Sequence, residues 1–102
     1  MIHVIAAIEV QPGKRDDFID AFRKLVPLVL AEDGCIAYGP TVDVYAGHDA
    51  QIPLRQNVVT VVEQWESVAH LQEHGKAAHM VAFFQQVGEM VASVSLQVTE
   101  PV

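Results

Sequence analysis

Apolar and polar residues alternate in four stretches of the chain, which is the pattern of half-buried β-strands. The first stretch places every second side chain of Ile2 to Val10 on one apolar face, and the third is rich in β-branched residues. The predicted strands cover residues 2–10, 35–45, 57–65 and 93–99. Gly39-Pro40 interrupts the second strand, so we expect a bulge or an edge position there.

Between these strands, apolar residues recur at helical spacing. The first predicted helix covers residues 14–32, with three aspartates in its first turns and Gly34 just beyond its end. Ser67 is a suitable N-cap for a short helix that ends at His74, and Gly75 separates it from a helix over residues 76–92. Residues 46–56 show no periodicity and predict a loop.

The resulting order, β-α-β-β-α-α-β, fits one α+β domain over residues 1–102 of the ferredoxin-like type, with helices on one face of an antiparallel sheet. The other sheet face then lacks a cover within the chain. A hydrophobic content of 51% is also high for a chain of 102 residues, which has much surface for its volume. We therefore expect a homodimer.

Charge and composition exclude several classes of partner. The formal net charge is −7, and no cluster of basic residues occurs, so nucleic acid is not an expected partner. The chain has no basic amphipathic helix and no long apolar span, which argues against a membrane partner. The first residues lack the features of a secretory signal, so a cytoplasmic location is expected. Cys35, the single cysteine, is expected in the core.

Candidate chemistry is densest in Glu63-Gln64-Trp65-Glu66-Ser67 and the three histidines that follow it, His70, His74 and His79. Glu63 and Trp65 share one strand face, and His79 begins a helix that we expect to pack over that face. Histidine suits acid–base chemistry because an unperturbed imidazole titrates near pH 6.5. Packing of Trp65 and a structural hydrogen bond of His79 would explain the same residues equally well.

A metal site is the alternative use of these histidines. His70 and His74 are four residues apart on one helix, and Glu66 or Glu73 would complete a set of two histidines and one carboxylate. The chain has no HExxH motif, and Gly75 places His74 at a helix end. We therefore expect no metal.

Motifs along almost the whole chain occur in the order typical of one family. They are Pro12-Gly13-Lys14-Arg15, Glu32-Asp33-Gly34-Cys35 with Tyr38, Glu63 to Ser67, and Leu71 to His74 with His79 and Phe83. On these residues the sequence resembles the antibiotic biosynthesis monooxygenase family of dimeric α+β barrels, including its quinol monooxygenase-like members.

This resemblance implies a homodimeric, cofactor-independent monooxygenase that acts on a small aromatic polyol or quinol and molecular oxygen. It implies a catalytic role for His79, with Trp65 as an aromatic wall and His74 and Glu63 as helpers. Candidate substrate-binding residues besides Glu63 are Tyr38, Phe22, Phe83 and Arg55. For these four, packing or a solvated surface charge is the simpler interpretation.

Other functions share the same motifs. A non-catalytic, ligand-binding or stress-associated dimeric barrel would need no chemistry, and an isomerase of a small oxygenated metabolite would use the histidines for proton transfer. Haem-degrading relatives also use a tryptophan and a histidine at the positions of Trp65 and His79. They add an asparagine on the first strand. This chain has Ala7 at the expected position and no asparagine within residues 2–10, which argues against haem cleavage.

Overall fold

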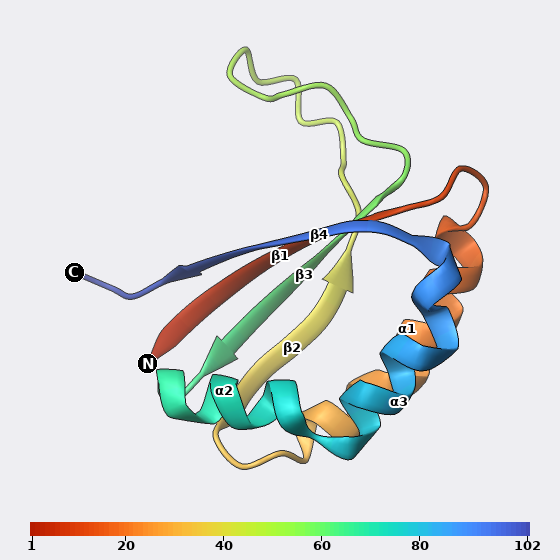
Figure 1. Cartoon of the computed structure of the whole chain (residues 1–102). Helices are drawn as coiled ribbons and strands as arrows, with labels where there is room; N and C mark the ends of the chain where they lie inside the picture. The colour runs from red at the N-terminus through yellow and green to blue at the C-terminus, as the bar shows by residue number, and fades with distance from the viewer.

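The computed structural model describes all 102 residues and has the predicted order of elements (Figure 1). The α+β, ferredoxin-like prediction is confirmed. The elements are β1 (Ile2–Val10), α1 (Arg15–Leu30), β2 (Cys35–Thr41), β3 (Val58–Trp65), α2 (Val68–Lys76), α3 (Ala78–Val87), a short 3-10 turn (Gly88–Met90) and β4 (Val91–Thr99). None of the helices is long and apolar enough to cross a bilayer.

The four strands form one antiparallel sheet in the order β2-β3-β1-β4. β1 lies between β3 and β4, and Ala6 is opposite both Val61 and Leu96. The three helices lie on the same side of the sheet, and the other side is uncovered (Figure 1). The alternation of β1 explains this arrangement, because its buried residues are every second one from Ile2 to Val10.

The core lies between this sheet face and the helices. From α1, Phe18, Phe22, Leu25 and Val29 are buried, at the spacing expected of one helical face. Trp65 at the end of β3 is the largest fully buried side chain. Phe18, Phe22 and Phe83 contact one another with ring centroids 5.6 to 5.9 Å apart, so an aromatic cluster joins α1 to α3.

The second strand is shorter than predicted and is not broken at Gly39-Pro40. It ends at Thr41, and those two residues pair with Val62 and Val61 of β3. β2 is an edge strand, so a proline there need not remove a ladder hydrogen bond. The irregularity instead lies between Cys35 and Ala37.

The segment after β2, residues 42–57, extends away from the sheet as a long loop (Figure 1). The loop is tied across its base, where the Arg55 guanidinium donates to both Asp43 carboxylate oxygens at 2.8 and 2.9 Å. The hydrogen bonds from Arg55 are the main cause that lowers the pKa of Asp43 to about 2. The predicted loop is therefore longer than residues 46–56, because the end of β2 contributes to it.

The helix break also differs from the prediction. Ser67 is the N-cap of α2 as predicted, and its Oγ accepts a hydrogen bond from the His70 N–H at 3.3 Å. Gly75 lies inside α2, and Ala77, with an extended backbone, separates α2 from α3. His74 is therefore in the last turn of a continuous helix, and its side chain is buried in the protein interior.

Candidate functional site

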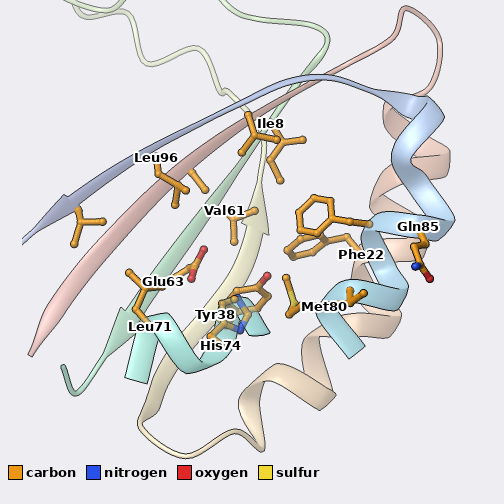
Figure 2. Close-up of a pocket in the computed structure, with 16 residues that line it drawn as sticks. Ile8, Phe22, Tyr38, Val61, Glu63, Leu71, His74, Met80, Gln85 and Leu96 are labelled. Atoms are coloured by element: carbon orange, nitrogen blue, oxygen red, sulfur yellow. The ribbon is translucent and has the colours of Figure 1, made fainter. Parts of the chain in front are cut away.

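A cavity of about 670 Å³ lies between the sheet and the last two helices (Figure 2). This volume is in the usual range for a small-molecule site. Twelve of its sixteen lining residues are hydrophobic, so it suits a largely apolar ligand. The lining residues are Ala6, Ile8, Phe22, Tyr38, Val61, Glu63, Leu71, His74, Gly75, Met80, Val81, Phe84, Gln85, Val94, Leu96 and Val98.

Strand alternation determines which side chains form the sheet wall. Ala6 of β1, Val61 of β3 and Leu96 of β4 are directly opposite one another and face the helices. The β4 part of this wall is only partly covered, because Leu96 keeps 58% of its surface exposed. The cavity is therefore open along β4, and residues of α2 and α3 form the wall opposite the sheet (Figure 2).

Three polar side chains, Tyr38, Glu63 and His74, meet at one end of this cavity, which we call its polar end (Figure 2). Tyr38 and Glu63 are paired across β2 and β3. The ring centroids of Tyr38 and His74 are 5.4 Å apart in an edge arrangement. All three residues are buried, whereas Gln85 of α3, the fourth polar side chain of the lining, is exposed.

Each of these side chains keeps one polar atom free for a ligand. Glu63 Oε1 accepts a hydrogen bond from Trp65 Nε1 at 2.9 Å, which leaves Oε2 free. The Tyr38 hydroxyl and His74 Nε2 also have no hydrogen-bond partner within the chain. Every fully buried side-chain nitrogen or oxygen has a hydrogen-bond partner. These three atoms have none, so they are accessible, and their residues line the cavity.

Burial changes the acid–base properties of the polar end. It raises the pKa of Glu63, while the Trp65 hydrogen bond and the nearby His74 act in the opposite direction. It also raises the pKa of Tyr38, and the neighbouring Glu63 adds to this effect. The Tyr38 hydroxyl therefore keeps its proton and can donate a hydrogen bond to a ligand, and Glu63 favours its protonated form more than an exposed carboxyl does.

His74 is oriented by two contacts behind the cavity. Its Nδ1 donates to Glu32 Oε2 at 2.9 Å, and the indole of Trp65 lies against its ring with centroids 4.7 Å apart. Because Nδ1 carries the proton of this hydrogen bond, Nε2 of the neutral ring is an acceptor. The arrangement can remove a proton from a ligand at the polar end.

His79 and Trp65, the two residues that the sequence places at the centre of the site, do not line the cavity. His79 Nε2 donates to the same Glu32 oxygen at 2.7 Å, and its side chain is 26% exposed. Trp65 is fully buried, and it contacts Glu63 and His74 of the site. Their catalytic roles stay predictions. Both residues lie behind the residues that line the cavity.

Of the other four candidate substrate-binding residues, two line the cavity and two do not. Phe22 and Tyr38 line the cavity and stack on each other with centroids 5.5 Å apart. Phe83 packs behind Phe22 in the core. Arg55 is not part of the lining and is bound to Asp43 in the loop.

The residues considered for a metal site are not gathered in one place. No three His, Cys, Asp or Glu side chains lie together in an arrangement that would hold a metal ion. His70 Nδ1 is hydrogen-bonded to Ser67 Oγ at 2.7 Å, and His70 Nε2 lies 3.9 Å from Glu66. Cys35 is half-buried beside the core, and burial raises the pKa of its thiol.

Sequence reasoning missed Glu32 and much of the apolar wall. Glu32 was given no role beyond the end of the first helix and a motif of the family resemblance. Its partners His74 and His79 lie 42 and 47 positions later, and no local pattern indicates that they bind it. Of the wall residues, Leu71 was given only as part of a family motif, and Met80 and Phe84 only as the apolar face of the last helix. The helical spacing of Met80 and Phe84 is the only sequence signal for this wall. In the structure Phe84 is 41% exposed.

Known proteins resemble this chain over most of its length. Residues 1–86 match the antibiotic biosynthesis monooxygenase family. The chain is 40% identical to the Escherichia coli K12 protein named "Probable quinol monooxygenase YgiN", over 99% of this chain and 98% of that protein.

Solved structures share the fold over nearly the full length. A conserved protein of Methanosarcina mazei superposes with a TM-score of 0.82 at 22% identity, covering 99% of this chain and 92% of the other. The protein Rv0793 of Mycobacterium tuberculosis superposes with a TM-score of 0.79 at 24% identity, covering 99% and 94%. With its family match and its relative of 40% identity, the chain belongs to the antibiotic biosynthesis monooxygenase family.

Proposed function

We propose that this protein is a cofactor-independent monooxygenase of a small hydroquinone or polyphenol, with His74 as its base. One observation carries the proposal: His74 Nε2 is open to an apolar cavity while Glu32 holds its Nδ1. The family and the name of the Escherichia coli relative support the reaction class.

The shape of the cavity favours an aromatic substrate with hydroxyl groups at one end. Phe22, Val61 and Leu96 would contact the faces and edges of a ring. A ring hydroxyl at the polar end would meet the Tyr38 hydroxyl, Glu63 Oε2 and His74 Nε2. A site built in this way discriminates against ligands without hydroxyls, because its buried polar groups would then be unpaired.

The proposed reaction needs no reductant other than the substrate. His74 Nε2 removes a hydroxyl proton, and the electron-rich phenolate transfers an electron to molecular oxygen. The resulting radicals combine to form a carbon–oxygen bond. The O–O bond and the C–H bond of the attacked ring carbon then break. One oxygen atom stays on the ring and the other leaves as water, so that hydroquinone and O2 give a hydroxyquinone and water.

Tyr38 and Glu63 serve the other proton transfers of this sequence. The Tyr38 hydroxyl donates a hydrogen bond to the phenolate oxygen, since its raised pKa keeps it protonated. Glu63, whose pKa burial raises, supplies a proton to the departing oxygen. An aromatic substrate against the apolar walls would displace water from the polar end, which would strengthen each of these interactions.

We also propose that the protein is a homodimer in the cytoplasm. Its accessible surface is 6522 Å², against about 5,700 Å² for an average folded monomer of its mass. Several large apolar side chains are exposed on the uncovered sheet face, β4 and the long loop: Ile5, Val62, Val94, Leu96, Val98, Val44, Tyr45, Ile52 and Leu54. Sedimentation equilibrium at micromolar concentration should give twice the chain mass of 11.2 kDa, and a stable monomer would contradict the dimer.

Oxygen uptake by metal-stripped protein with a panel of hydroquinones and polyphenols, corrected for autoxidation, tests the function. We expect His74→Ala to lower kcat/KM by about 100-fold or more, since a general base contributes 10² to 10⁴. His48→Ala is a matched control, because His48 lies in the exposed loop away from the cavity.

Three results would contradict the proposal in different ways. Full uptake by His74→Ala, with loss in His79→Ala, would identify His79 as the base. Turnover that continues under nitrogen would indicate an isomerase. Saturable binding of these phenols without turnover would indicate a ligand-binding protein.

A further inference from the structure

Glu32 is a largely buried carboxylate that the proposed reaction does not use directly. Its side chain is 14% exposed, and it lies in the turn between α1 and β2. One of its oxygens, Oε2, binds two imidazoles: His74 Nδ1 at 2.9 Å and His79 Nε2 at 2.7 Å. It does not line the cavity, so any effect on a ligand must pass through its partners.

We propose that Glu32 is the positioning residue of the site, which holds His74 in the tautomer with a free Nε2 and connects His79 to it. The inference rests on the proposed function only in treating His74 as the base. The role given to Glu32 is a structural one that exists with or without a ligand.

The tautomer follows from the chemistry of the contact. A carboxylate oxygen can only accept hydrogen bonds, so the proton of neutral His74 must be on Nδ1. No other group of the chain is hydrogen-bonded to His74 Nδ1. Without Glu32 the ring would be free to carry its proton on Nε2, and a ring in that form cannot accept a proton from a ligand at the polar end.

The turn that carries Glu32 is rigidly held, as a positioning role requires. The Glu32 N–H donates to the Val29 carbonyl at 2.9 Å, and the Cys35 N–H donates to the Glu32 carbonyl at 3.3 Å. The Glu66 N–H donates to the Gly34 carbonyl at 2.9 Å, which ties the turn to the end of β3. The carboxylate is thus fixed relative to the strand that carries Glu63 and Trp65.

His79 takes part through the same oxygen. Its side chain is more exposed than that of His74, 26% against 8%, and it does not line the cavity. Its hydrogen bond holds the Glu32 carboxylate from the side of α3. Replacement of His79 should therefore weaken catalysis by loosening Glu32, without any loss of a contact to substrate.

Nitrogen-15 NMR of histidine-labelled protein reads the tautomer directly, in two-bond proton–nitrogen spectra assigned with His74→Ala. We expect His74 to carry its proton on Nδ1 in the wild type and in Asp33→Asn, the adjacent-carboxylate control. Glu32→Ala should lose this preference. Glu32→Gln should keep it, since an amide oxygen still accepts from both rings, and it provides the test if the alanine variant folds poorly.

The kinetic counterpart is a fall in kcat of about 10- to 100-fold in Glu32→Ala, the usual cost of losing an orienting partner, with KM changed less than threefold. Glu32→Gln should recover part of this loss. His79→Ala should lower kcat in the wild type and have less than a twofold effect when Glu32 is already alanine, because both act through one contact.

Two results would overturn the inference. An unchanged His74 tautomer in Glu32→Ala would show that Glu32 does not set it, whatever the activity. A full, additive loss from His79→Ala on the Glu32→Ala background would show that His79 acts independently. If the tautomer responds as expected and no phenol supports oxygen uptake, the positioning role stands and the proposed reaction fails.

Discussion

Glu63 is a buried carboxyl whose ionisation is linked to the stability of the fold. The carboxyl is buried beneath the helices, and this burial raises its pKa. A neutral Glu63 is thus favoured in the folded protein. Its contribution to the free energy of unfolding is fully present below the ordinary carboxyl pKa of about 4.3 and is lost as the pH rises through the raised folded value.

We therefore expect Glu63→Gln to stabilise the protein relative to the wild type, increasingly from about pH 4.3 upward. The amide has no charge to bury, and its oxygen still accepts the Trp65 Nε1 hydrogen bond. Urea unfolding of both proteins at a series of pH values measures the difference. A difference that is flat or decreases with pH would show that the burial of Glu63 is not costly.

At the residue scale, the sequence predicted some residues of the site but not which of them line the cavity. Strand alternation correctly placed Glu63 on the face beneath the helices, because side-chain direction in a strand follows from position alone. The roles of His74 and His79 depend on where α2 ends. Since the break is at Ala77 and not at Gly75, His74 remains on the buried side of a helix and His79 starts the next one.

At the scale of elements, the turn between α1 and β2 decides where Glu32 lies. Gly34 has a φ of +79°, a left-handed conformation that favours glycine, and a Cβ at this position would overlap the ring of His70. Gly13 has the same φ, and no atom lies within 4 Å of the position of its Cβ. Alanine substitutions at the two glycines therefore distinguish the cost of the backbone conformation from the cost of steric overlap.

We expect Gly13→Ala to cost about 1 to 2 kcal/mol, the usual penalty for this backbone conformation. Gly34→Ala should cost clearly more and should also lower kcat, because the turn that holds Glu32 must shift. Thermal or urea unfolding together with the oxygen assay measures both effects. Equal destabilisation of the two variants would mean that His70 moves aside freely.

The elements themselves were predictable where local chemistry determines them. The alternating strands and the Ser67 N-cap follow from periodicity and capping preference. The end of β2 did not follow, because Val42, Val44 and Tyr45 continue an apolar pattern that has no partner strand to pair with. Pairing is a long-range property, and β3 begins only at Val58.

At the scale of the whole molecule, the cavity is assembled from side chains of all four strands and all three α-helices, which no local pattern brings together. The order of elements predicted a ferredoxin-like fold with the helices on one face of an antiparallel sheet. The gathering of Tyr38, Glu63 and His74 at one end required the register of β2 on β3 and the position of α2. The geometry of the cavity does not identify a reaction class, and the prediction of a monooxygenase came from the resemblance to a family.

The most direct test of the central claim is the reaction of metal-stripped protein with a hydroquinone under oxygen-18 gas, followed by mass spectrometry. The account predicts one labelled atom in the quinone product and one in water, with product formation lost in His74→Ala and kept in His48→Ala. Quinone product without the label, or labelled product that forms equally well in His74→Ala, would contradict it.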